Sequence, residues 1–122
     1  MATTDTKSNL DISSEGNVAI IAFKSSYISD VEEISSDSAQ IRQFINKNHP
    51  QQVIFDFAGV KFFSSQVLGL LLEAKAQLKS SNGRVVVCTL DPRLHRVFKI
   101  TNLDRIFPLY PDRPSALDAI AG

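Results

Sequence analysis

The spacing of apolar and polar residues changes several times along the chain, and each change predicts an element. Three short runs rich in β-branched residues have the pattern of buried strands: Val18–Phe23, Gln52–Phe57 and Arg84–Thr89. Between these runs, apolar residues recur every three or four positions, as they do on one face of a helix. The pattern therefore predicts strands and helices that alternate along most of the chain.

The beginning of the chain predicts a hairpin. Leu10–Ser14 alternates weakly between apolar and polar residues, and Glu15-Gly16-Asn17 is typical of a turn before the first buried strand. The polar segment Met1–Ser8 is expected to be a flexible tail, followed by one domain over residues 9–122. After the hairpin, Lys24–Ser29 is expected to be a polar loop.

Helix start and stop signals follow. Asp30 is a good N-cap for the first helix, and His49-Pro50 ends that helix. The second helical run ends at Ser81-Asn82-Gly83. Asp91-Pro92 predicts the start of a third, short helix, with proline at its first position.

The last strand is interrupted. Ile106–Tyr110 contains Pro108, which places this strand at an edge of the sheet, and Asp112–Ala121 is expected to be a closing helix. Two strands are thus followed by helices and strands in alternation. This order predicts an α/β single domain with a mixed, mainly parallel β-sheet, an N-terminal hairpin and about four covering helices.

Composition excludes several classes of function. The chain has 122 residues, 43% of them hydrophobic, and its 13 basic and 13 acidic side chains balance. A net charge of zero argues against binding nucleic acid by phosphate neutralisation. No apolar run approaches the roughly 20 residues of a membrane span, and the start lacks the apolar stretch of a signal peptide. We expect a soluble, cytoplasmic protein with no nucleic-acid partner and no membrane insertion.

The balanced charge is unevenly distributed. Residues 1–74 hold nine acidic and five basic side chains, whereas residues 75–122 hold four acidic and eight basic ones. One interpretation is that the basic excess lies on solvated helix faces. The other is an electrostatic patch that steers an acidic partner.

Residues with catalytic or metal-binding chemistry are sparse. The lone Cys88 lies among valines, and His49 and His95 lack the spacing of a zinc motif. No glycine-rich phosphate loop is present. Asp56 lies near the C-terminal end of a central strand, as in a response-regulator receiver, but Lys24-Ser25-Ser26 stands where a receiver has its acidic pair. We therefore expect no catalysis, no metal and no cofactor.

The most informative stretch is Asp56–Gly69, with the sequence DFAGVKFFSSQVLG. It resembles the STAS domain of anti-sigma factor antagonists, in which Asp-hydrophobic-x-x-Val-x-Phe precedes Asp-Ser-Ser/Thr-Gly-Leu-Gly at a helix start. Gly83–Cys88, Pro92–Phe98 and Thr101–Phe107 are similar to the strand, helix and ending that follow in that family. The resemblance covers roughly residues 10–120 and implies a STAS-like fold.

The resemblance implies a non-catalytic, partner-switching regulator of transcription. In the family, an anti-sigma factor with a histidine-kinase-like ATPase fold acts as a serine kinase on its antagonist, and a serine phosphatase is a further expected partner. The matching phosphorylation site is Ser65, with Ser64 as the second choice. The expected partner-binding residues are Lys24, Ser25, Ser26, Asp30, Phe63, Ser64, Gln66 and Val67.

The position of Ser65 also suits a phosphate on physical grounds. It is expected at or next to the N-cap of the helix Gln66–Ser80, where backbone N–H groups have no helical partner. These groups and the helix dipole favour an anion. A phosphate there adds about −1.5 to −2 charges at the surface without disrupting the fold.

Three residues depart from the family motif. Ser64 replaces its Asp, Gln66 replaces its second Ser/Thr, and Val67 replaces its Gly and is expected to obstruct a kinase active site. The departures favour an alternative, a STAS scaffold subunit of a transporter or sensory complex that is never phosphorylated. An enzyme or small-ligand protein is a third hypothesis, and it would depend on Asp56 and the two serines.

Overall fold

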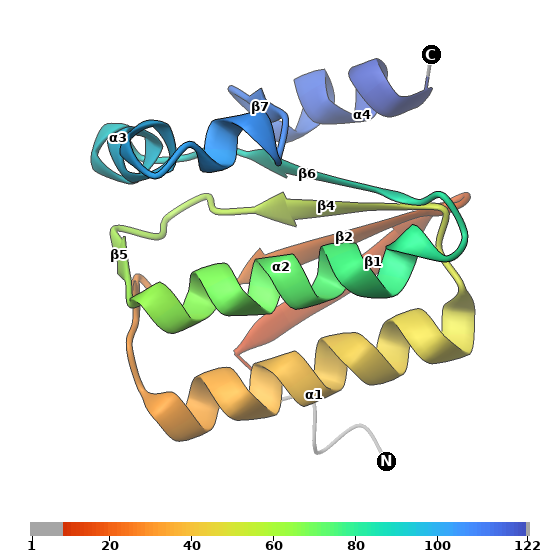
Figure 1. The fold of residues 1–122 in the computed structure, drawn as a ribbon, viewed down its shortest axis with the longest axis horizontal. Coiled ribbons are helices and arrows are strands. Elements are labelled where there is room, and N and C mark those ends of the chain that lie inside the picture. The colour runs from red at the N-terminus through yellow and green to blue at the C-terminus, as the bar shows by residue number, and fades with distance from the viewer. Residues whose placement is uncertain (1–8, 122) are drawn as a thin grey trace.

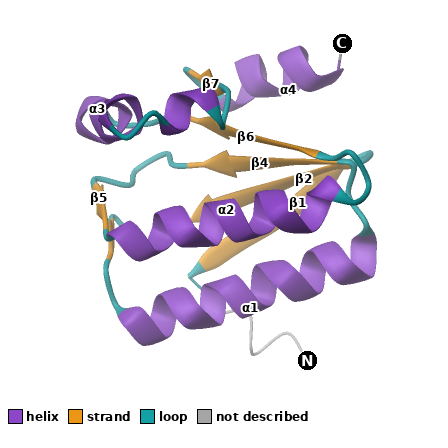
Figure 2. Cartoon of the chain, viewed as in Figure 1, coloured by secondary structure: helices purple, strands orange, loops and turns teal. Residues whose placement is uncertain are grey.

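The computed structural model describes residues 9–121, and the predicted tail Met1–Ser8 lies outside them. Helices and strands alternate as the sequence predicts, with two additional short strands (Figure 2). The elements are β1 (Leu10–Glu15), β2 (Val18–Phe23), β3 (Tyr27–Ile28), α1 (Val31–Asn48), β4 (Gln52–Asp56), β5 (Phe62–Phe63), α2 (Ser65–Lys79), β6 (Arg84–Cys88), α3 (Pro92–Ile100), the 3₁₀ helix η2 (Leu103–Arg105), β7 (Leu109–Tyr110) and α4 (Arg113–Ala121).

The main sheet has five strands in the order β1-β2-β4-β6-β7. The pair β1–β2 is antiparallel, and every other neighbouring pair in this sheet is parallel. The hairpin turn uses Gly16 at φ +61°, a backbone conformation that glycine adopts without steric strain. The predicted N-terminal hairpin and mixed, mainly parallel sheet are therefore confirmed.

Helices cover both faces of the sheet. α1 and α2 lie on one face and α4 lies on the other (Figure 1). Each face of the sheet has its own hydrophobic core, and alternate residues of the central strand β4 point into one core or the other. Phe55 is buried toward α1 and α2, and Ile54 is buried toward α4. Burial on both faces explains why the central strands are continuous apolar runs.

Two sequence-based boundaries were wrong. Lys24–Ser29 is not entirely a loop, because Tyr27–Ile28 forms β3 and pairs in parallel with β5. A strand of two residues has no periodicity that a sequence pattern can reveal. The last strand is shorter than Ile106–Tyr110, because Leu103–Arg105 forms a 3₁₀ helix and Pro108 lacks the N–H that a ladder needs. Its predicted position at the sheet edge is confirmed.

An ion pair joins the end of β4 to the start of α4. Arg113 Nε donates to Asp56 Oδ2 at 2.8 Å, and the Ala58 backbone N–H donates to Asp56 Oδ1 at 3.0 Å. The side chain of Asp56 is only 5% exposed, whereas that of Arg113 is 39% exposed. The carboxylate therefore fixes both the closing helix and the turn after β4.

We expect Arg113→Ala to lower the free energy of unfolding by about 2 kcal/mol, because it leaves the buried Asp56 carboxylate without its cation. Arg105→Ala is the matched control, since Arg105 is exposed, and its loss should stay within about 0.5 kcal/mol. Urea unfolding measures both variants. Equal losses in the two would contradict this role of the ion pair.

Candidate functional site

The starts of α1 and α2 meet at one edge of the molecule, beside β5 (Figure 1). The Lys61 and Phe62 backbone N–H groups both donate to the Ser26 carbonyl, at 2.8 and 3.2 Å. The Ser64 N–H donates to the Ile28 carbonyl at 2.9 Å. These bonds and the β3–β5 pairing form a backbone clamp that brings the predicted loop beside the predicted helix start.

The two serines of the clamped segment have different environments. Ser64 is the N-cap of α2, with extended backbone, but its hydroxyl makes no cap hydrogen bond, and its buried Oγ has no hydrogen-bond partner among residues 9–121. Ser65 is the first residue of the helix, and it is exposed. Of the two, Ser65 presents the more accessible hydroxyl, next to the free N–H groups of the first turn.

The neighbours of Ser65 divide into buried and exposed residues. Val67 is fully buried, so its side chain lies in the core and not on the surface next to Ser65. Phe63 is 6% exposed and lies in the core, with its ring centroid 5.5 Å from that of Phe57. Gln66 is exposed. Phe63 and Val67 therefore hold the start of α2 on the core, and they offer no surface to a partner in this conformation.

An exposed apolar surface accompanies the clamp, and sequence analysis missed it. We name Tyr27, Val31 and Phe62 the apolar rim; their exposed fractions are 65%, 60% and 48%. Tyr27 and Phe62 stand opposite each other in the β3–β5 pair. The only sequence signals were an aromatic residue in an otherwise polar loop and a second phenylalanine beside the buried one. Clustered apolar exposure of this kind is typical of a binding surface.

A groove of about 240 Å³ runs from the rim between α1 and α2. It is lined by Val31, Ile34, Ser35, Ser38, Gln66, Gly69, Leu70 and Glu73. At Gly69 a Cβ atom would meet nothing within 4 Å, so the groove is open there. The groove thus places an apolar residue of the rim and the exposed Gln66 on one shared surface.

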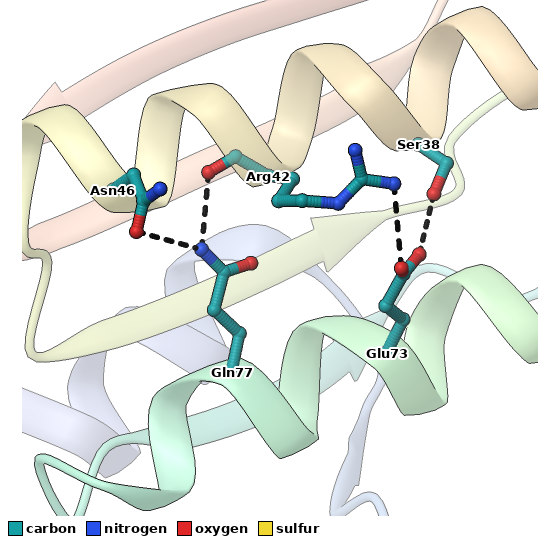
Figure 3. Close-up of polar contacts among 5 residues, drawn as sticks. All are labelled: Ser38, Arg42, Asn46, Glu73 and Gln77. Carbon is teal, nitrogen blue, oxygen red and sulfur yellow. Dashed lines mark hydrogen bonds and ion pairs between the residues drawn. The ribbon is translucent and has the colours of Figure 1, made fainter.

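Polar contacts join the two helices, beginning with two residues of the groove lining, Ser38 and Glu73 (Figure 3). Ser38 Oγ donates to Glu73 Oε1 at 2.5 Å, and Arg42 pairs with the other oxygen of that carboxylate at 3.3 Å. Gln77 Nε2 donates to the Arg42 carbonyl at 3.0 Å. The hydrogen bond from Ser38 lowers the pKa of Glu73. These contacts fix the spacing of α1 and α2.

The remaining predicted loop residues face elsewhere. Lys24 lines a separate groove between β1 and α1, together with Asp11 and Lys47. Ser25 Oγ donates to Asn9 Oδ1 at 2.6 Å. Ser26 therefore takes part in the clamp through its carbonyl group. Lys24 and Ser25 instead bind Asn9, through the Lys24 backbone N–H and the Ser25 hydroxyl.

A buried carboxylate anchors this loop. Asp37 of α1 is 2% exposed and accepts a hydrogen bond from Asn9 Nδ2 at 3.1 Å, while Asn9 also binds Ser25. Burial raises the pKa of Asp37, and the hydrogen bond from Asn9 lowers it by a smaller amount. Apolar periodicity does not mark Asp37 as buried, and sequence alone does not show that Asn9 lies within hydrogen-bond distance of it.

The raised pKa of Asp37 gives stability a defined pH dependence. Above the usual value of 3.8, and up to the raised pKa, the folded chain binds this proton more tightly than the unfolded chain does. The contribution of Asp37 to stability therefore falls as pH rises through that window. Relative to Asp37→Asn, the wild type should lose stability between about pH 3 and pH 7. Urea unfolding at both pH values measures this difference, and a constant difference would contradict it.

Replacing the N-cap residues of α1 and α2 by alanine should lower the free energy of unfolding by different amounts. The Asp30 side chain accepts hydrogen bonds from the N–H groups of Glu32 and Glu33, so Asp30→Ala should cost about 1 kcal/mol. Ser64→Ala should cost less than about 0.5 kcal/mol, because the Ser64 hydroxyl accepts no bond from its helix. Thermal unfolding compares the two variants. A larger loss for Ser64→Ala would show that its hydroxyl is bonded after all.

The described chain offers little other chemistry. Within residues 9–121, no three His, Cys, Asp or Glu side chains gather closely enough to hold a metal ion. In the same range, no helix is both long and apolar enough to cross a membrane. Cys88 is buried, and its burial raises the pKa of the thiol to about 11, which makes it a poor nucleophile.

Comparison with known families matches residues 11–116 to the STAS domain, and the chain belongs to that family. Over 111 residues it is 23% identical to the anti-sigma F factor antagonist of Paenibacillus polymyxa, covering 89% of this chain and 93% of that protein. The resemblance found in the Asp56–Gly69 passage is thus confirmed.

Solved structures confirm the STAS-like fold. A STAS domain protein of Planctomyces limnophilus, described as an anti-sigma-factor antagonist, has a TM-score of 0.83 at 24% identity, over 93% of this chain and 98% of that one. The anti-sigma factor antagonist SpoIIAA in its unphosphorylated form has a TM-score of 0.79 at 19% identity, over 93% and 96%. Bacillus SpoIIAA in its phosphorylated form has a TM-score of 0.71 at 19% identity, over 91% and 98%.

Proposed function

We propose that this chain is a non-catalytic anti-sigma factor antagonist that is switched by phosphorylation of Ser65. The observation that carries the proposal is the exposed Ser65 at the first position of α2, held by the backbone clamp beside the apolar rim. The similarity to an antagonist from Paenibacillus polymyxa and to SpoIIAA, which has a phosphorylated form, supports the same role. This role places the chain in the cytoplasm.

The unphosphorylated chain binds its partner through this edge of the molecule. The partner is an anti-sigma factor with a histidine-kinase-like ATPase fold that acts as a serine kinase, and binding releases the sigma factor. Apolar partner groups cover the rim, which burial from water favours. The proposed contact residues are Tyr27, Asp30, Val31, Phe62, Ser65 and Gln66, with Phe63 and Val67 as their support.

Phosphorylation reverses this binding by adding charge. The kinase transfers the γ-phosphoryl group of ATP to Ser65 Oγ, so that an O–P bond forms, ADP leaves and the hydroxyl proton passes to a base of the kinase. The first-turn N–H groups of α2 and the helix dipole stabilise the new phosphate. The start of α1 already carries Asp30, Glu32 and Glu33 at the same edge. Added negative charge there repels or repositions the partner, and a serine phosphatase restores binding.

Two variants at one position test the switch. Against the anti-sigma factor kinases of the same host, Ser65→Ala should bind with wild-type affinity in calorimetry, and Ser65→Glu should bind at least about tenfold more weakly. Phe62→Ala should also weaken binding, whereas Ile106→Ala, an exposed apolar residue of another region, should not. Equal affinities for Ser65→Ala and Ser65→Glu would overturn the switch.

Mass spectrometry of the protein from its native host identifies the modified residue. One phosphate on Ser65 is expected. A phosphate on Ser64 would move the site to the buried hydroxyl and require the start of α2 to open. No phosphate under any growth condition would favour a permanent STAS scaffold of a transporter or sensory complex.

A further inference from the structure

The exposed flank of α2 has a composition that the switch site does not explain. Leu68, Leu72, Lys75, Ala76 and Lys79 recur at three- and four-residue spacing and form one stripe along the helix. Leu72 is 42% exposed although it is a large apolar residue. The stripe begins near the switch site and ends at the far end of α2, away from β5 (Figure 1).

A groove of about 590 Å³ accompanies the second half of this stripe. It is lined by Leu72, Lys75, Ala76, Lys79, Asn82 and Gly83. We name these residues the basic groove. At Gly83 a Cβ atom would lie 2.9 Å from the Gln51 carbonyl oxygen and from Leu78 Cβ, so the backbone at this end of the groove is closely packed. Its lining combines two apolar side chains, Leu72 and Ala76, with two ammonium groups and no carboxylate.

The positive charge of the groove is not neutralised within the described chain. Neither Lys75 nor Lys79 pairs with a carboxylate of residues 9–121. The single carboxylate of α2, Glu73, lies on the flank that faces α1, where Ser38 and Arg42 hold it (Figure 3). The rest of the chain from residue 75 is also rich in basic residues. The groove is therefore complementary to an acidic ligand.

We propose that the basic groove docks an acidic segment of a partner protein. An apolar side chain of that segment lies on Leu72 and Ala76, and two carboxylates one helical turn apart reach Lys75 and Lys79, which are themselves about 6 Å apart along the axis. The combination of apolar side chains and paired lysines favours such a segment over a small inorganic anion, because a small anion has no apolar group to bury. A nucleic acid is less suited, because two lysines neutralise few phosphates and the chain has no net charge.

The basic groove is separate from the switch site. Lys79 lies about 21 Å along the helix axis from Ser65, at the rise of an ideal α-helix. A partner in the groove and a partner at the apolar rim therefore meet different parts of α2. The proposal does not rest on phosphorylation of Ser65, and it holds for a permanent scaffold as well.

The test uses the full chain labelled with ¹⁵N and a synthetic helical peptide of about 15 residues, in which Glu residues one turn apart flank a stripe of Leu. Amide shifts should change along Leu72–Gly83. A matched peptide with Gln in place of Glu should bind at least about tenfold more weakly, and so should the double variant Lys75→Glu/Lys79→Glu. Lys75→Arg/Lys79→Arg should keep binding, and Lys99→Glu, elsewhere on the surface, is the matched charge control.

Three results would overturn the proposal: equal binding of the Glu and Gln peptides, shifts confined to the apolar rim, or tighter binding to duplex DNA or anionic vesicles at equal salt. Circular dichroism of the Lys75→Glu/Lys79→Glu variant checks that it folds, and the Gln peptide tests the charge requirement on the unaltered chain. Ser65→Glu should leave peptide binding unchanged. Peptide binding by this variant tests the docking proposal independently of the proposal that phosphorylation of Ser65 is a switch.

Discussion

The backbone clamp between β3 and β5 is the interaction on which the candidate site depends. One carbonyl, that of Ser26, accepts two N–H groups of the segment before α2, and Ile28 accepts the N–H of Ser64. These bonds hold a loop and a helix start that are more than thirty residues apart in the sequence. Because they use only backbone atoms, they leave the side chains of Tyr27 and Phe62 free to face solvent.

Helix α2 joins most of the features of the molecule. Its inner face packs on the sheet through Val67, Leu71 and Leu78, and a second side is bonded to α1 through Glu73. The third side carries Ser65 at one end and the basic groove at the other. Because the sheet and α1 both hold α2 in place, a partner that binds at either end of α2 meets a preorganised surface. Preorganisation reduces the conformational entropy lost on binding.

Two buried carboxylates have related structural roles. Asp37 anchors the loop before β3 through Asn9, and Asp56 anchors the turn before β5 together with Arg113. Asp37 therefore stabilises the segment that leads into β3, and Asp56 stabilises the segment that leads into β5. Buried polar groups need partners, and here the partners are the Asn9 side chain, the Ala58 backbone N–H and the Arg113 guanidinium.

The sequence by itself determined the longer strands, the four α-helices, the family and the serine pair at a helix start, because period, caps and motifs are local properties of the chain. Only the tertiary structure decided which serine is exposed, that Val67 points into the core, and that Lys24 faces away from the site. It also revealed the apolar rim, since β3 and β5 are too short to have a period of their own. Exposure and pairing depend on what the fold brings near, and residues such as Asn9 and Asp37 meet only once the sheet and α1 have packed.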